Sequence, residues 1–319
     1  MTHLRTIRYL WVTGTVLAAF FGTARAQTVG FALSYDEALE PAVQLRDLNA
    51  GPTTLDVRLA GGVAGPLEAG AAVRSRTSFG PLGTFSLTGR ADVDTAGAFA
   101  LGVEGAGALA ATGLDASLSL SNRNPGAFAP TAAYALGSRP FFTGDGVNAY
   151  LALGATQRLG RTLILEATPS LSYLSGTGVG VGFESRLQGR RIVESDNGVA
   201  LLEASTGPGS GRGFVAGGAE YQLNRRGLPS LTGAVLLGRS EAGIRPGVRA
   251  SAGGEVGGFS YRAEVSAEPY RRTAPPYRAN VAVGTALGPG ALGLELGAAL
   301  KNDFGVPPVL IRSSYAFRF

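Results

Sequence analysis

The last eleven residues of the chain alternate between two kinds of side chain. Counted back in steps of two, one set is Phe319, Phe317, Tyr315, Ser313, Ile311 and Val309, and the other is Arg318, Ala316, Ser314, Arg312 and Leu310. A period of two predicts a β-strand, because successive side chains of a strand point to opposite faces. One face of this strand is aromatic and apolar, and the other is largely polar. Such a strand needs lipid, or a second layer of protein, over its apolar face.

The same alternation recurs through most of the chain. It is clearest at 55–63, 85–93, 114–120, 179–187, 259–265 and 292–300. Each segment has about 8–12 residues, which is the length that a tilted membrane-spanning strand requires. At about 15 residues per strand, the chain has room for about 16–18 strands joined as hairpins and none for crossover helices. The pattern therefore predicts an all-β, antiparallel, up-and-down arrangement.

The connections between these strands are predicted to differ in length at the two ends. Short turns are expected at 159–162, 256–258 and 288–291, and longer connections at 121–130, 138–146, 188–197, 205–212, 269–276 and 302–308. Strict alternation of strand direction places the short turns at one end with Phe319 and most long connections at the other. The stretch 188–197 departs from this rule, because strand parity places it at the end with the short turns.

One segment near the N-terminus has a helical signal. Ser34 and Glu37 have the spacing of a capping box, in which a serine begins a helix and a glutamate three residues later reaches back to it. Pro41 argues against a sustained helix. The segment 34–39 is therefore expected to be a short helix or a bend between the first two strands.

The N-terminus has the pattern of a secretory signal peptide. Two arginines precede an apolar run at 9–21, and small residues stand at 24 and 26, as at a cleavage site. We therefore expect 1–26 to be a signal peptide and 27–319 to be a single domain. The run is too short for a membrane helix of about 20 residues, and no later run reaches that length. A mature chain that is integral to a membrane must then be a barrel, because only helices and closed barrels satisfy the backbone in lipid.

The C-terminal strand resembles the closing strand of bacterial outer-membrane β-barrels, including the porins. In that class a terminal Phe, with aromatic or apolar residues two and four places before it, is recognised by the barrel-assembly machinery. The resemblance assigns this role to Tyr315, Phe317 and Phe319, whereas Ser313 departs from the usual apolar choice. It implies a transmembrane β-barrel in the bacterial outer membrane, with outer-membrane lipid and the assembly machinery as partners.

The polar faces of the predicted strands carry many charges of both signs. Burying an unpaired charge in a dry core costs several kcal/mol, so these side chains need water. In a barrel they line the lumen, and lipid covers the apolar faces. The expected lumen-lining residues are Asp56, Arg58, Arg90, Asp92, Asp115, Arg158, Glu166, Glu184, Arg186, Glu220, Arg262, Glu264, Glu295 and Arg312. Glu264 and Glu268, spaced like paired catalytic carboxylates, are better explained as part of this solvated lumen. With both signs inside, we expect weak selection among ions.

The chain lacks the side chains of most catalytic and metal sites. Its only histidine is His3, inside the predicted signal peptide, and it has no cysteine. Histidine- or thiol-based catalysis is therefore excluded, and transition metals lose their two preferred ligands. We predict no enzyme activity and no catalytic, cofactor or metal site. Nucleic acid is not expected as a partner, because the formal charge of +5 falls to about +2 once the three arginines of 1–26 are removed, with no basic cluster left.

Three functions remain open from the sequence. The first is a passive, porin-like diffusion channel for small polar solutes. The second is a non-conducting structural or anchoring barrel that holds cell-surface layers, with that layer or a second copy of the chain as partner. The third is a secreted, soluble β-sandwich or adhesin domain, which would bury the apolar faces between two sheets. The loop 137–146, with the aromatic pair Phe141–Phe142, is read as a surface loop in preference to a constriction.

Overall fold

A computed structural model describes most of the chain beyond the predicted signal peptide. The described residues are 28–35, 38–62, 65–78, 80, 83–123, 134, 146–159, 163–175, 178–193, 196–206, 213–271, 275–300 and 306–318. Within the strands, the side chains at 50, 182, 184, 186, 188–193, 196–197 and 205–206 are outside this description. The predicted signal peptide, Phe319 and the Phe141–Phe142 pair also lie outside the described residues. Among the described residues, no helix is long and apolar enough to cross a membrane.

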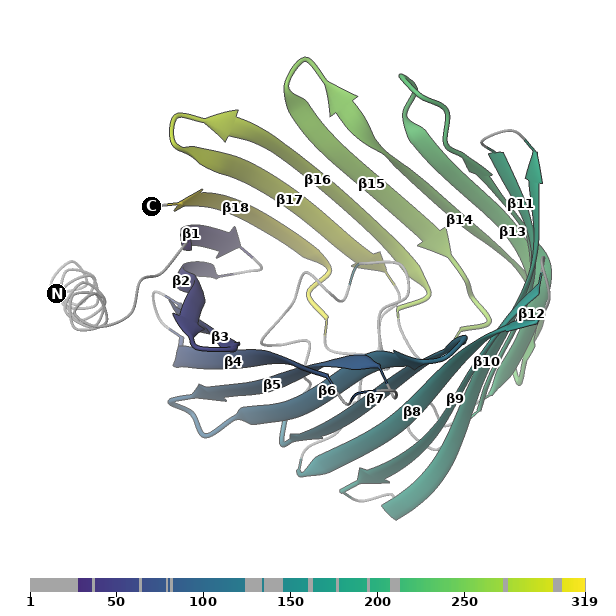
Figure 1. Cartoon of the computed structure of the whole chain (residues 1–319), viewed down its shortest axis with the longest axis horizontal. Helices are drawn as coiled ribbons and strands as arrows, with labels where there is room; N and C mark the ends of the chain where they lie inside the picture. The colour runs from purple at the N-terminus through teal and green to yellow at the C-terminus, as the bar shows by residue number, and fades with distance from the viewer. Residues whose placement is uncertain are drawn as a thin grey trace, which may run out of the picture.

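Eighteen strands make up the described part of the chain (Figure 1). They are β1 (Thr28–Tyr35), β2 (Leu39–Ala50), β3 (Thr53–Gly61), β4 (Leu67–Ser78), β5 (Thr84–Asp94), β6 (Phe99–Leu109), β7 (Thr112–Ser121), β8 (Asn148–Leu159), β9 (Leu163–Leu174), β10 (Gly178–Val193), β11 (Asp196–Thr206), β12 (Phe214–Leu223), β13 (Ser230–Ser240), β14 (Gly243–Val256), β15 (Phe259–Ala267), β16 (Tyr277–Leu287), β17 (Gly290–Leu300) and β18 (Val309–Arg318). The number agrees with the predicted 16–18.

The strands form one closed antiparallel sheet. Each strand pairs with its neighbours in sequence, as β4 does with β3 and β5. The last strand returns to the first, with Thr28 opposite Arg318 and Tyr35 opposite Ile311. Closure leaves no unpaired sheet edge among the described strands, which removes the usual route to edge-to-edge aggregation. The predicted up-and-down barrel is confirmed.

The two ends of the barrel differ as predicted. At one end, here called the turn end, β2–β3, β6–β7, β14–β15 and β16–β17 are joined by two residues each. The opposite end, called the loop end, has the long connections, among them 122–147, 268–276 and 301–308. Thr28 at the start of β1 pairs with Arg318 at the end of β18, and the number of strands is even. The beginning of β1 and the end of β18 therefore both lie at the turn end.

Two sequence interpretations need correction. The stretch 188–197 was expected to be a connection, but β10 continues to Val193 and pairs with β11, which begins at Asp196. Polar residues are typical of loops, yet a barrel strand tolerates them wherever its backbone is paired. At 34–39, Ser34 belongs to β1 and its hydroxyl donates a hydrogen bond to the carbonyl oxygen of Glu40 at 3.3 Å. Ser34 therefore lies in a strand and does not cap a helix, and Ala38, just before β2, is in a bend.

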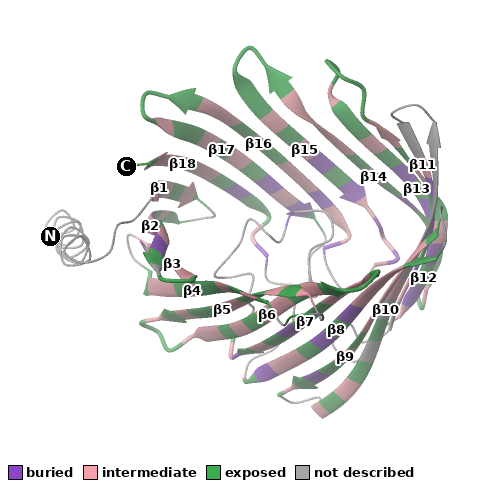
Figure 2. Ribbon diagram, in the orientation of Figure 1, coloured by how far each residue is buried: buried purple, intermediate pink, exposed green. Residues whose placement is uncertain are grey.

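The outer face of the barrel is apolar. Along strands such as β13 and β15, exposed residues alternate with less exposed ones (Figure 2). The most exposed of the large apolar side chains include Val181 (73%), Val179 (71%) and Val235 (66%). At the closing seam, Phe31 of β1 stacks on Phe317 of β18 with ring centroids 6.5 Å apart. An exposed apolar surface of this extent is stable only against lipid, so the chain has the architecture of a transmembrane β-barrel.

Candidate functional site

One ion pair identifies the inner face of the barrel. Arg249 of β14 donates to both carboxylate oxygens of Glu203 of β11, at 2.9 and 2.6 Å. Two strands separate β11 from β14, so their backbones are about 14 Å apart at the usual spacing of neighbouring strands. Side chains of strands this far apart converge only on the concave side of a curved sheet, so Glu203 and Arg249 both point into the barrel. The strand period of two then assigns an inner or outer face to every other strand residue.

The residues predicted to line the lumen lie on this inner face. Asp56, Arg58, Arg90, Asp92 and Arg312 line one cavity. Around the rest of the wall, the inward positions include Asp115 of β7, Arg158 of β8, Glu166 of β9, Glu220 of β12, Arg262 and Glu264 of β15, and Glu295 of β17. The backbone of β10 places positions 184 and 186 among them, but the side chains of Glu184 and Arg186 are outside the description. The predicted residues therefore do not form one site.

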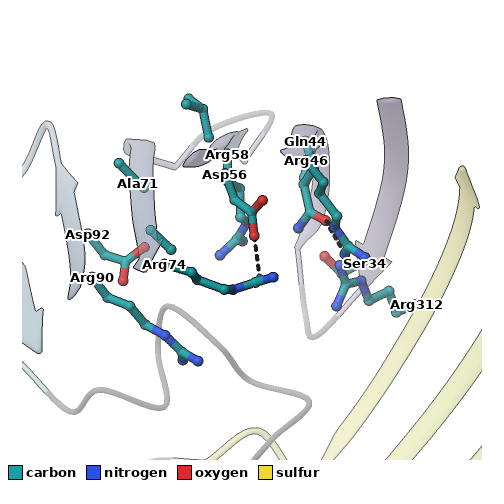
Figure 3. Close-up of a pocket in the computed structure, with 14 residues that line it drawn as sticks. Ser34, Gln44, Arg46, Asp56, Arg58, Ala71, Arg74, Arg90, Asp92 and Arg312 are labelled. Atoms are coloured by element: carbon teal, nitrogen blue, oxygen red, sulfur yellow. Dashed lines mark hydrogen bonds and ion pairs between the residues drawn. The ribbon is translucent and has the colours of Figure 1, made fainter. Parts of the chain in front are cut away.

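Five arginines gather on one side of the lumen. Arg46 of β2, Arg58 of β3, Arg74 of β4, Arg90 of β5 and Arg312 of β18 line a cavity of about 390 Å³, and we call them the arginine wall (Figure 3). In this view Arg46 and Arg312 lie on one side of the cavity and Arg90 on the other. Sequence reasoning missed Arg46 and Arg74. The signal that was available is their even spacing from Gln44 and Arg76, which continues the polar face of each strand.

The carboxylates at this cavity lie close to the barrel wall. Asp56 forms an ion pair with Arg74 and accepts a hydrogen bond from the backbone N–H of Asp47 at 2.9 Å. Asp92 lies over Gly70 of the neighbouring strand, where any Cβ would overlap its carboxylate. Outside the cavity lining, Glu68 forms an ion pair with Arg58 at 3.5 Å. The five guanidinium groups therefore share the cavity lining with two carboxylates.

A second cluster, called the anchor cluster, lies toward the loop end and consists of Glu203, Arg249, Glu268, Arg271 and Arg278. Arg249 lies between the two carboxylates, and its Nε donates to Glu268 at 2.8 Å. Arg271 is 3.1 Å from Glu203 and 3.3 Å from Glu268. Arg278 completes the cluster at 3.6 Å from Glu268. The cluster ties the segment 268–271, which follows β15, to the inner wall at β11 and β14.

The electrostatics of Glu268 follow from this cluster. Burial alone would raise the pKa of this carboxyl, but the positive charges of Arg271, Arg249 and Arg278 outweigh burial and lower it below its usual value. Glu268 is 1% exposed and Glu264 is 5% exposed. Glu264 accepts a hydrogen bond from Nε of Arg262 at 2.7 Å. The expectation that both carboxylates are solvated is therefore wrong, because arginines replace water around them.

Tyr270 holds the same segment by packing. Its ring fills the space above Gly238 of β13 and Gly247 of β14, where a Cβ on either glycine would clash with the ring. It packs at 5.4 Å from the ring of Phe214, and its hydroxyl donates to Glu268 at 3.1 Å. Burial and the neighbouring charge of Glu268 raise the pKa of Tyr270, so it stays protonated as a donor. No feature of the sequence marked these two glycines as a socket.

Tyr134 makes a contact across the barrel. It belongs to the connection between β7 and β8, yet it packs against Gly297 of β17 and clusters with Ala299, Val306 and Leu310. Its hydroxyl donates to the carbonyl oxygen of Pro307 at 2.6 Å. The β7–β8 and β17–β18 hairpins stand nearly opposite each other in the closed sheet. Tyr134, which is 1% exposed, therefore joins two facing walls at the loop end.

The chemistry of the lumen is electrostatic. Within the described ranges, no group of three or more His, Cys, Asp or Glu side chains is placed to hold a metal ion. The side chains that face the lumen offer guanidinium donors, carboxylate acceptors and hydroxyl groups. A hollow barrel with such a lining can pass, select or hold polar solutes.

The fold and the lumen together define an 18-stranded barrel with an apolar outside and a charged inside. Solved structures of similar shape include a variant of the porin of Rhodobacter blastica, at 14% identity, covering 92% of this chain and 98% of that one with a TM-score of 0.44. Pseudomonas aeruginosa OccK10 (OpdN) is 13% identical over 93% of this chain and 99% of its own, with a TM-score of 0.49. A bacterial polysaccharide outer membrane secretin is 8% identical over 92% and 98%, also at 0.49.

These similarities do not assign the chain to a family. No protein-family model matches it, and no curated protein matches it significantly. The barrel assignment rests on the pairing of the eighteen strands and on the apolar outer face.

Proposed function

We propose that the protein is a passive diffusion channel for small polar solutes in the bacterial outer membrane. The observation that carries this proposal is the closed sheet of eighteen strands with a charged inner face. Barrels of about 16–18 strands are wide enough to leave an aqueous channel. Small residues on the inner face, such as Ala72 and Gly102, add to the free width.

The soluble alternative fits poorly. A β-sandwich needs two sheets that pack through their apolar faces. Here all eighteen described strands form one sheet, and its apolar face is exposed on the outside.

A non-conducting, anchoring barrel is the second candidate. The observation in its favour is that two connections of the loop end are fixed to the inner wall, one by Tyr134 and one by the anchor cluster. Contacts of this kind reduce the open cross-section at that end.

Single-channel recording separates the two candidates. The mature chain from Gln27 would be refolded and inserted into a planar lipid bilayer in 1 M KCl, with heat-unfolded protein as the control. A channel predicts stable current steps on the order of a nanosiemens, the scale expected for an aqueous lumen. Insertion shown by protease protection, without current steps, would instead establish the anchoring barrel.

A further inference from the structure

The arginine wall is a patch of net positive charge inside a lumen that contains charges of both signs. Its cavity is lined by five arginines and two aspartates. Glu68 and Glu295 lie outside this lining, beside Arg58 and Arg312 respectively. If both glutamates are counted with the lining, one positive charge remains in excess. The field of such a patch is focused by the low-dielectric barrel around it.

Three of the five guanidinium groups make no ion pair with another described residue, although Asp92 lies near Arg90 and Glu295 near Arg312. Among the described residues, Arg46 donates to the neutral amide of Gln44, at 3.1 Å from Nε, and has no ion pair. Arg90 and Arg312 have neither a hydrogen bond nor an ion pair with another described residue. Asp56 already has two partners in the barrel wall, the guanidinium group of Arg74 and the backbone N–H of Asp47. Its carboxylate oxygens are therefore not aimed at Arg46, Arg90 or Arg312.

On the strands that follow, inward carboxylates outnumber inward arginines among the described residues. Glu104 of β6, Asp115 of β7 and Glu166 of β9 face the lumen there, with Arg158 of β8 as the arginine among them. On β6 to β9, the described charges that face the lumen are therefore mostly acidic, opposite in sign to the excess at the arginine wall.

From this geometry we infer that the arginine wall is a binding site for small multivalent oxyanions, carrying carboxylate or phosphate groups, and that it makes the lumen prefer anions. The planar guanidinium fork matches both groups bidentately, and such charge-assisted hydrogen bonds are about twice as strong as neutral ones. A cavity of about 390 Å³ accommodates a molecule the size of a small dicarboxylate. The preference for anions rests on the proposed function as a channel, whereas the binding site does not.

The selectivity arm compares two matched arginines. Arg90→Gln removes a charge from the wall, and Arg158→Gln removes the same charge from the acidic side of the same lumen. Both side chains are exposed. In a KCl gradient, the reversal potential of the wild type should show anion preference. Arg90→Gln should lower the anion-to-cation permeability ratio by about twofold, and Arg158→Gln by much less. Cation preference in the wild type, or equal shifts in the two variants, would overturn the inference.

The binding arm does not need conduction. The folded, detergent-solubilised protein would be titrated calorimetrically at low ionic strength with succinate and, separately, with inorganic phosphate. Binding of succinate alone, phosphate alone or both supports the site and identifies the group that it prefers. The triple variant Arg46→Gln, Arg90→Gln, Arg312→Gln should bind at least about tenfold more weakly, and heat-modifiable gel mobility would show that it folds. No binding of either anion would refute the site.

The two arms separate the two proposals. Binding without current steps would remove the channel but retain the anion site. Current steps without binding and without anion preference would retain the channel and remove the site.

Discussion

At the scale of single residues, two glycines decide where an aromatic ring can sit. Gly238 and Gly247 leave the inner wall flat at neighbouring strands, and Tyr270 occupies the resulting space. Neither glycine has a positive φ, so their role is the absence of a Cβ. The structure therefore uses glycine here to admit a side chain from a distant connection.

Gly238→Ala should displace Tyr270. Overpacking of this kind costs about 1–3 kcal/mol, which would be lost from the anchoring of 268–271. The measurement is the rate of tryptic cleavage after Arg271 in the folded barrel, which should rise about tenfold as this segment opens. Gly233→Ala is the matched control, because it lies on the same strand and a Cβ there would meet nothing within 4 Å. Equal cleavage in both variants would show that the socket does not hold the segment.

The lowered pKa of Glu268 predicts that acid loosens the same segment. Because its pKa in the folded protein lies below the usual value of 4.5, the carboxylate stabilises the anchored segment fully above pH 4.5. This stabilisation is lost as the pH falls through the lowered pKa, where Arg249, Arg271 and Arg278 lose their shared partner.

Spin-label mobility measures this transition. The chain has no cysteine, so a single nitroxide can be attached after Pro269→Cys. Its mobility should stay constant above pH 4.5 and rise as the pH falls below that value, through the lowered pKa of Glu268. In the Glu268→Gln background the label should be mobile already at pH 7 and change less. A label whose mobility rises already above pH 4.5, or rises equally in the Glu268→Gln background, would contradict the prediction.

At the scale of elements, the seam between β1 and β18 completes the barrel. Phe31 and Phe317 stack across it, and Tyr315 lies 6.1 Å from Phe317 while its hydroxyl donates to the carbonyl oxygen of Leu287 at 3.0 Å. Tyr315 and Phe317, which the resemblance assigns to recognition by the assembly machinery, thus make contacts that stabilise the closed sheet. That recognition remains a prediction, and Phe319 lies outside the described residues.

Phe317→Ala tests both roles. Loss of two aromatic contacts should lower the free energy of unfolding in lipid vesicles by about 1–3 kcal/mol. In cells, the yield of assembled barrel should fall further than this loss explains. The control is Ile311→Ala on the same face of β18, where an apolar side chain is removed outside the aromatic positions. If both variants reduce assembly equally, Phe317 has no special part in recognition.

The strands were predictable, but the contacts between them were not. Alternation is a local property, so the strands around Leu55 or Phe259 follow from neighbouring residues alone. The pair Glu203–Arg249 spans 46 positions and depends on the register of three intervening strand pairings and on the curvature of the sheet. The sequence shows neither. Strand alternation likewise predicted that Arg90 and Asp92 face the lumen. It could not predict that they share a cavity with Arg46, because that depends on the register between strands.

At the scale of the whole molecule, Tyr134 links facing walls. Tyr134→Ala should lower the free energy of unfolding by about 3–5 kcal/mol, as for other large buried aromatic side chains, and Tyr134→Phe by about 1 kcal/mol through loss of one hydrogen bond. Urea unfolding in lipid vesicles measures both. Tyr173→Ala is the control, because that ring is on the outer face and 46% exposed. A larger loss for Tyr173→Ala than for Tyr134→Ala would argue against the cross-barrel link.

The pairing of Thr28 with Arg318 has a consequence for how the polypeptide can be connected. The two ends of the closed sheet are neighbours, so a short linker could join them and new ends could be opened at another turn, giving a circular permutant with the same eighteen strands. A permutant opened between β16 and β17 would move the aromatic strand to the interior of the chain. It should refold in vitro but fail to assemble in cells. This result would separate the role of β18 in closing the sheet from its role in recognition by the assembly machinery.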